Sequence, residues 1–355
     1  GNVLYELGAG QEQKRDFTYV EVPAGTGQYA WIDYNNDGVQ QLNEFELAAF
    51  PDQAKFLRIL IPTNEFIKAN YITFNYSLSI SPRALMSKTD LRGIKQFISR
   101  LNINTSLQIS KKSIAEGNFE FNPFKYDISD TALVTLNRIL ANTVSYNRFS
   151  SKWGIDVSNV RNNGKALLTY GYESRKLRDW TAKFRWNLSR SLTMQISGKQ
   201  GINSLFIPNA QFDNRNYDLD IKSVEPMLTF INGTTFRIAA GYEYEEKVNL
   251  PQYGGETSTS HSINLESKYN VLQNSFVTGK FTFNDIDFIS KNGTATTTVS
   301  YIMLEGLLPG KNYLWSITLT KRLLNNLELN FQYDGRKAAS SKTVHIGRAS
   351  LTALF

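Results

Sequence analysis

A compact group of oxygen-bearing side chains lies between residues 33 and 44. These residues follow, without a gap, the pattern Asp-x-Asn-x-Asp-Gly, then five residues and a glutamate. In loops of this pattern, alternate side chains and one main-chain carbonyl converge on a single cation. The expected ligands are Asp33, Asn35, Asp37, the Val39 carbonyl, Gln41 through a water molecule, and both carboxylate oxygens of Glu44.

The ligand chemistry of this loop favours calcium. Hard oxygen donors in this number suit Ca²⁺, whereas Mg²⁺ prefers a smaller octahedral shell. Gly38 stands at the position that needs a sharp bend. The loop has no second copy, and residues 28–32 before it resemble a strand rather than a helix. We therefore expect one structural Ca²⁺ ion in an EF-hand-like loop. The alternative is a turn held by Asp and Asn side chains without a metal.

Groups suited to catalysis are few. The chain has no cysteine, which excludes thiolate metal sites and cysteine nucleophiles, and it has only two histidines. His261, in an expected polar loop, stands between Ser260 and Ser262 and offers the one candidate for a nucleophile–base pair. His345 begins the last alternating segment. We expect no enzymatic activity, and keep a hydrolase centred on His261 as the third alternative.

Composition narrows the class of protein. The chain has 355 residues, 20% charged and 13% aromatic, with a formal net charge of +7. No apolar run reaches the roughly 18 residues that a spanning helix needs, and the aromatic content is too high for a disordered chain. The basic residues are dispersed, which argues against nucleic acid and suits anionic lipid headgroups. A soluble all-β protein and a membrane β-barrel are the two options.

Alternation of apolar and polar residues dominates from residue 67 to the end. The segments run for about 9–12 residues or more, longer than the 5–6 typical of soluble strands and matched to a tilted membrane strand. Aromatic residues lie near the ends of the apolar faces, as interfacial girdles require. The clearest alternating segments are 72–79, 101–107, 180–188, 236–245, 263–269, 313–320, 327–334 and 347–355.

Short polar connections separate these segments and indicate an up-and-down meander. An open sheet of this size would expose its edges, and closure removes them. We predict an all-β fold: a transmembrane antiparallel up-and-down β-barrel of about 14–16 strands, an even number, with a small N-terminal β-rich segment. The predicted domains are residues 1–66, holding the loop, and residues 67–355, forming the barrel. The expected tight connections are 161–164, 189–191, 232–234 and 324–326.

The last segment carries a resemblance. Alternate small or apolar residues lead to a terminal aromatic, Phe355, similar to the C-terminal signal of bacterial outer-membrane barrels. The run from Tyr301 to Asn312, together with the Asp-x-Asn-x-Asp-Gly loop, resembles large outer-membrane proteins of the Bacteroidota. The resemblance implies a location in the bacterial outer membrane and carries no assigned activity.

The expected function is non-enzymatic: transport, or a role in a secretion or envelope complex. The expected partners are the lipid bilayer, anionic lipid headgroups and other outer-membrane or periplasmic proteins. The chain begins at Gly1 without an apolar leader, so we expect a processed protein or a piece of a longer one. The alternative is therefore a structural or adhesion barrel that anchors a longer N-terminal surface region.

Overall fold

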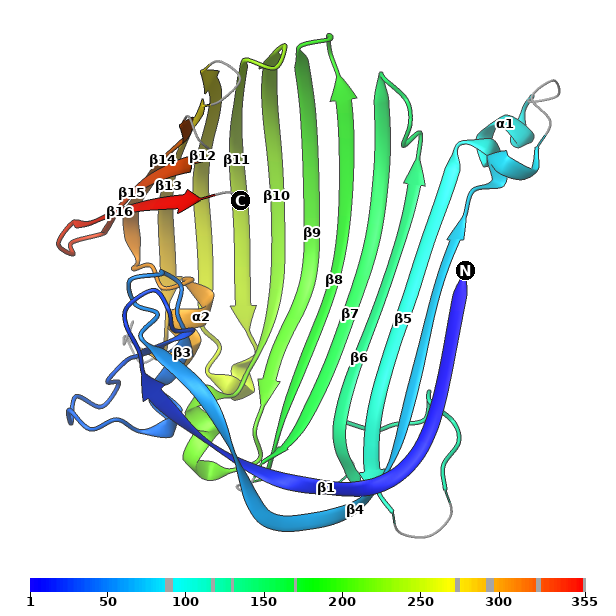
Figure 1. The fold of residues 1–355 in the computed structure, drawn as a ribbon, viewed down its shortest axis with the longest axis vertical. Helices are drawn as coiled ribbons and strands as arrows, with labels where there is room; N and C mark the ends of the chain where they lie inside the picture. Colours follow the sequence, from blue (N-terminus) through cyan, green and yellow to red (C-terminus); the bar gives the residue numbers. More distant parts are fainter. Residues whose placement is uncertain are drawn as a thin grey trace.

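The computed structural model describes the chain except residues 87–91, 116–118, 129–130, 169–170, 272–274, 292–296, 324–326 and 354–355. One sheet of 16 strands dominates it (Figure 1). Fourteen strands have 10 to 25 residues, and two have only three. The long strands are β1 (Asn2–Glu21), β4 (Phe56–Ile80), β5 (Leu101–Ile114), β6 (Leu133–Tyr146), β7 (Trp153–Leu168), β8 (Gly171–Asn187), β9 (Leu192–Phe206), β10 (Tyr217–Asn232), β11 (Phe236–Asn249), β12 (Thr257–Val271), β13 (Ser275–Ile289), β14 (Gly310–Leu323), β15 (Leu327–Ala338) and β16 (Val344–Ala353).

The remaining elements are short. The two small strands are β2 (Tyr29–Trp31) and β3 (Phe45–Leu47), and the helices are α1 (Ile94–Ser99), α2 (Thr298–Met303), η1 (Leu42–Glu44), η2 (Pro82–Leu85), η3 (Ala210–Arg215) and η4 (Pro251–Tyr253). In the part of the chain that the structure describes, no helix is long and apolar enough to cross a membrane.

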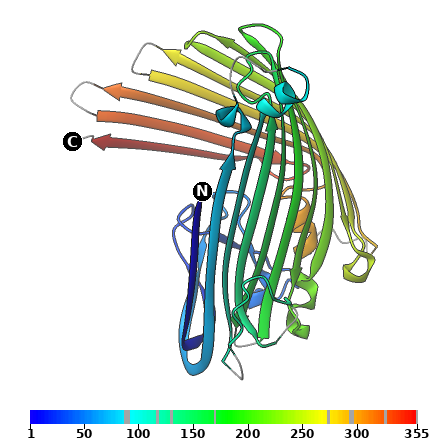
Figure 2. The same cartoon turned by 90° about the vertical axis from the view of Figure 1, so that its right-hand side faces the viewer.

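From β4 to β16, each long strand pairs antiparallel with the next long strand along the chain. This order confirms the predicted all-β class and the up-and-down arrangement. The sheet is strongly curved (Figure 2). Among the described residues, β16 pairs only with β15, whereas β1 pairs with β4 and touches β7 at one position. We call the fourteen long strands the wall, and its two edge strands are therefore β1 and β16.

The two faces of the wall carry different kinds of side chain: apolar ones on the outer face and polar ones on the inner face. Phe331 lies opposite Leu319 on one side and Ala349 on the other, so these apolar side chains share the outer face. Phe331 is 44% exposed, as expected for a side chain that faces a surrounding apolar phase. The alternate residues, such as Gln332 and Asp334, lie on the inner face, where Gln332 donates a hydrogen bond to Asp334.

Connections differ between the two ends of the wall. Tight turns at 188–191 and 233–235 occupy one end, whereas 207–216, 250–256 and 290–309 at the other end carry short helices. The expected turns at 189–191 and 232–234 are thus found, and 324–326 lies outside the described residues. Only two long strands, β13 and β14, separate 272 from 325. The last residues of β12 and β14 therefore lie at the same end of the sheet as the turns at 188–191 and 233–235.

The expected turn at 161–164 is wrong. These residues lie inside β7, with Asn163 opposite Lys176 of β8 and Asn162 opposite Ile139 of β6. Pairing on both sides holds the backbone extended, and the Asn163 side chain donates a hydrogen bond to the Tyr126 hydroxyl. Ladder hydrogen bonds to two neighbours therefore outweigh the local turn preference of Asn and Gly.

Residues 22–55, called the head below, form an insertion between β1 and β4 that contains β2 and β3, and β2 pairs with β4 at Tyr29 opposite Phe56. Strands β1 and β4 pair from Asn2 opposite Ser77 to Glu21 opposite Phe56, and run together along one end of the sheet toward the head (Figure 1). The predicted boundary at residue 66 falls inside β4, which runs unbroken from Phe56 to Ile80. The first residues of the chain, by contrast, belong to the wall.

Candidate functional site

The predicted calcium loop joins β2 to η1 within the head. One carboxylate oxygen each from Asp33, Asp37 and Glu44 lies within 4.8 Å of the other two. The backbone reaches this arrangement through two left-handed residues, Asn36 at φ 58° and Gly38 at φ 73°. Both residue types adopt this conformation at low cost, which is why the sequence bends here.

Main-chain N–H groups fix the two aspartates. The Asp33 carboxylate accepts from the N–H of Asp37 at 3.2 Å and of Gly38 at 2.8 Å. Asp37 accepts from the N–H of Val39 at 2.7 Å, and this bond holds the pKa of the exposed Asp37 carboxyl below its usual range. The Asp37 carboxyl is therefore kept in the ionised form, which is the form that binds cations.

Glu44 is held differently, because it is buried. Only 2% of the residue is exposed, and its Oε2 accepts from the Trp31 indole at 2.9 Å and from the Gln41 N–H at 3.2 Å. The carboxylate is thus oriented toward the two aspartates from the inner side of the loop. Three negative charges within 4.8 Å repel one another unless a cation or protons offset them.

The other expected ligands surround Asp37. Asn35 and Gln41 each donate a side-chain N–H to Asp37 Oδ2 at 2.8 Å, and Asn35 Oδ1 accepts from the Asp37 N–H at 3.0 Å. The structure therefore brings together the three carboxylates, with both amides in contact with one of them. The side chain of Val39, whose carbonyl is the remaining expected ligand, is exposed. An all-oxygen donor set of this kind fits Ca²⁺.

The head lies against the inner face of the wall near β15. Arg336 donates from Nη2 to Asp52 Oδ2 at 2.7 Å, and a second bond joins Nη1 to Oδ1. The guanidinium also lies 4.3 Å from the centre of the Phe50 ring. These hydrogen bonds hold the pKa of Asp52 below its usual range. A two-point ion pair of this kind fixes orientation as well as distance.

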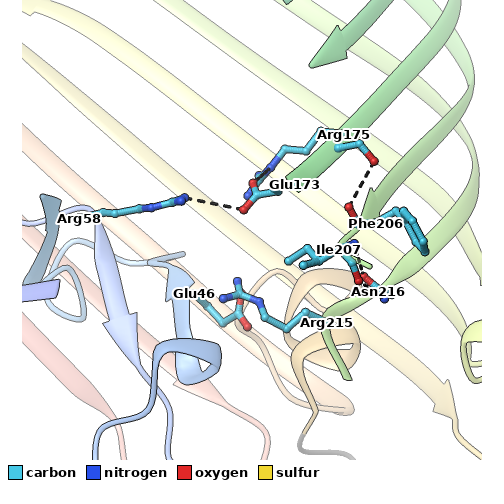
Figure 3. Close-up of polar contacts among 9 residues, drawn as sticks. Glu46, Arg58, Glu173, Arg175, Phe206, Ile207, Arg215 and Asn216 are labelled. Atoms are coloured by element: carbon cyan, nitrogen blue, oxygen red, sulfur yellow. Dashed lines mark hydrogen bonds and ion pairs between the residues drawn. The ribbon is translucent and has the colours of Figure 1, made fainter. Parts of the chain in front are cut away.

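A second ion pair joins the head to η3. Arg215 donates to Glu46 at 3.1 Å, with side-chain exposures of 11% and 4% (Figure 3). Burial raises the pKa of Glu46 above its usual value, although the charge of Arg215 opposes the shift. Farther along the wall, Glu173 Oε1 lies 2.7 Å from Arg175 Nε, and Glu173 Oε2 lies 3.9 Å from Arg58 Nη1 (Figure 3). The Glu46–Arg215 and Arg58–Glu173 pairs therefore join separate elements, whereas Glu173 and Arg175 both belong to β8.

A third contact is made by α2 and the residues after it. The Ala49 N–H donates to the Tyr301 hydroxyl at 3.0 Å. A β-carbon at Gly306, which has φ 74°, would come within 2.5 Å of the Ala49 Cβ, so glycine permits this close approach. Leu42 of the head packs against the buried cluster around Phe212 and Met303. The head is therefore anchored to β15, η3 and α2.

Two cavities open on the inner face. One of about 280 Å³ lies between the head and β13–β16 and is lined mainly by apolar groups together with Lys280, Arg336 and Arg348. Another of about 300 Å³ lies over β11–β13 beside the end of α2, and its lining is mainly polar. The inner face thus carries charges of both signs and includes the pair Arg237–Glu266, whose Nη1 and Oε1 atoms lie 3.6 Å apart.

His261 does not form the candidate nucleophile–base pair with a neighbouring serine. His261 lies within β12, not in a loop, and its Nδ1 is 2.7 Å from the Tyr242 hydroxyl. Ser260 and Ser262 point to the opposite face, where their hydroxyls lie 3.3 Å apart. Successive side chains of a strand alternate between faces, so a strand assignment separates these groups. His345 Nδ1 lies 2.8 Å from the Tyr333 hydroxyl on the outer face.

The contacts that hold the head were not predicted from the sequence. Asp52 and Arg336 are 284 residues apart, and Glu46 and Arg215 are 169 apart. One signal in the sequence was available: residues 22–55 are inserted between two strands that pair with each other, so both ends of the insertion lie at the same end of the wall.

No known family profile matches the sequence, and no curated protein matches it. Similar solved structures include the outer membrane channel DcaP of Acinetobacter baumannii, with a TM-score of 0.41 and 12% identity, covering 98% of this chain and 96% of that one. The ferric-catecholate import receptor Fiu from E. coli K12, in its open form, gives a TM-score of 0.45 and 9% identity, over 84% of this chain and 59% of Fiu. A loop L8 deletion mutant of OmpT, an outer membrane protein of Vibrio cholerae, gives a TM-score of 0.39 and 9% identity, over 98% of both chains.

Proposed function

We propose that the chain forms a bacterial outer-membrane β-barrel for transport, whose lumen is narrowed by the head. The observation that carries the proposal is the docking of the head through two ion pairs, Asp52–Arg336 on the inner face and Glu46–Arg215 at η3. Fourteen long strands suit a barrel wide enough for a channel or a filled lumen. A Bacteroidota source and the action of the C-terminal signal stay predictions.

The outer face supports the membrane location. It exposes large apolar side chains along many strands, among them Trp180, Ile263 and Phe331, each about 44–45% exposed. Exposed apolar area on this scale is unfavourable in water and favourable in lipid. The adhesion or anchor alternative shares this wall, so it is distinguished from transport by conductance.

Excising the head should open the barrel to ions. Glu21 lies directly opposite Phe56, so residues 22–55 can be replaced by an Asn-Gly hairpin turn that keeps β1 paired with β4. In planar bilayers we expect low single-channel conductance from the complete chain and a several-fold higher value from the excised one. The physical reason is removal of the segment that occupies the inner face.

A matched control shortens a connection at the same end. Removing residues 251–254 between β11 and β12 leaves every described head contact intact and should leave the conductance unchanged. Equal conductance with and without the head would contradict its role in narrowing the lumen. A folded, head-excised barrel that passes no ions would instead favour the anchor alternative.

We also propose that the head binds one Ca²⁺ ion through Asp33, Asp37 and Glu44, with the Val39 carbonyl and the amides of Asn35 and Gln41 beside it. The convergence of three carboxylates on one point supports this assignment. The loop precedes η1, whose Leu42 packs on the cluster between the head and the wall. The ion would therefore stiffen the part of the head that docks.

Removing calcium should loosen the head and spare the wall. With a dissociation constant of about 10⁻⁴–10⁻³ M, millimolar Ca²⁺ stabilises the docked head by only about 0.4–1.4 kcal/mol. Chelation should therefore speed proteolysis within residues 22–55 and leave the heat resistance of the barrel unchanged. Glu44→Ala should reproduce the effect, whereas Glu21→Ala, which removes an exposed carboxylate at the base of the head, should not.

Terbium gives a second readout, because Trp31 donates to Glu44 at 2.9 Å and can sensitise a Tb³⁺ ion in the loop. Tb³⁺ luminescence that Ca²⁺ displaces and Glu44→Ala abolishes would support the site. Identical proteolysis with and without Ca²⁺ and no sensitised luminescence would leave the metal-free turn as the better account.

A further inference from the structure

The polar cavity over β11–β13 has a regular construction. Inner-face residues of the three strands stand side by side in rows: Glu243, Ser262 and Asn284 form one row, and Glu245 and Ser260 begin the next. Ser258 of β12, two residues before Ser260, lies on the same face opposite Lys247. The wall of the cavity is thus a ladder of hydroxyl, amide and carboxylate groups, with a volume of about 300 Å³.

The charge of this cavity is negative. Its lining includes Glu243, Glu245 and Glu305, and a single cation, Lys247. Lys247 lies 2.7 Å from both Glu245 and Glu305 and also donates to the Met303 carbonyl at 3.1 Å. These contacts use all three donors of its ammonium group. Glu243 has no ion-pair partner among the described residues.

The cavity also contains a polar group without a partner among the described residues. Ser258 is 3% exposed, lines the cavity, and makes no side-chain hydrogen bond in the described part of the chain. A nearly buried hydroxyl without a partner, on the same lining as an unpaired carboxylate, suits a ligand that carries hydrogen-bond donors.

From this arrangement we infer that the cavity binds a small hydroxylated organic cation, such as an amino sugar. Its ammonium group would pair with Glu243, and its hydroxyls would bond to Ser258 and the neighbouring ladder. A cavity of this size is at the lower end of the range for small-molecule sites. The inference names a class of ligand for the proposed transport function. The binding itself does not depend on transport, but the role of the ligand as a transported molecule rests on the proposed function.

The test measures glucosamine binding to the detergent-folded, complete chain by calorimetry, with glucose and N-acetylglucosamine as uncharged analogues. We expect saturable binding of glucosamine and at least tenfold weaker binding of both analogues. Glu243→Gln should weaken glucosamine binding by about tenfold to a hundredfold, the range expected for one hydrogen bond to a charged group. Ser258→Ala, which removes an unpaired hydroxyl, should weaken it without loss of folding.

Glu266→Gln serves as the matched control. Glu266 is an inner-face carboxylate of β12 outside the cavity lining, so its removal should leave glucosamine binding unchanged. Absence of glucosamine binding, equal binding of glucose, or equal loss in Glu266→Gln would each overturn the inference. None of these outcomes depends on whether the barrel conducts, so failure here is distinguishable from failure of the transport proposal.

Discussion

Replacing Arg215 with methionine should weaken docking of the head by about 3–5 kcal/mol, the cost of leaving one member of a buried ion pair without its partner. Glu46 is the group left behind, with 4% of its side chain exposed. Tyr34, whose hydroxyl lies 3.5 Å from Glu46, cannot offset its charge. The measurement is the urea concentration at which protease first cleaves within residues 22–55.

The double variant and a control complete this test. Glu46→Leu combined with Arg215→Met should recover most of the loss, because neither charge is then buried alone. Arg237→Met removes an exposed pair on the same inner face and should cost about 0–1 kcal/mol. Equal effects of Arg215→Met and Arg237→Met would show that burial of the Glu46–Arg215 pair contributes nothing.

The pH dependence follows from the direction of the Glu46 shift. Its pKa in the docked state is raised above the value in the free chain, so the docked head binds the proton more tightly. Its contribution to docking is therefore full below the free-chain pKa and is lost as pH rises through the docked-state pKa. Without Arg215 the pKa rises further, so Arg215→Met should be least harmful in acid.

Placing arginine on the outer face gives the second large effect. Phe331→Arg should destabilise the barrel by about 2–4 kcal/mol near the bilayer midplane, because the side chain must then face lipid. Asn330→Arg, one residue away on the inner face, should be far milder. Both are measured by urea unfolding from lipid bilayers. Similar losses for the two variants would mean that the two faces share one environment.

The wall could be predicted because its signals are local. In β15, successive residues from Leu327 to Asp334 face opposite sides of the sheet, so Phe331 lies on the outer face and Gln332 on the inner face. The turn expected at 161–164 failed because pairing with β6 and β8 decides the conformation there. The carboxylate loop was predictable because the hydrogen bonds to its three carboxylates all come from residues 31–41.

The docking of the head could not be predicted from spacing. Asp52 has no local feature that selects Arg336 among the 39 Lys and Arg residues, and only the folded wall brings them together. The same holds for the polar cavity, whose rows exist only in the register of three paired strands.

The long separation of Asp52 and Arg336 also sets an order of assembly. Neighbouring wall strands are close in sequence and can pair quickly, whereas a contact across 284 residues requires closure of a long loop. We therefore expect head docking to follow formation of the hairpin of β14 and β15. Because the head emerges from β1 and β4 and binds β15, docking tethers the first edge of the wall to the strand beside the last. We expect this tether to raise the effective concentration of β1 near β16 and so to favour closure of the barrel.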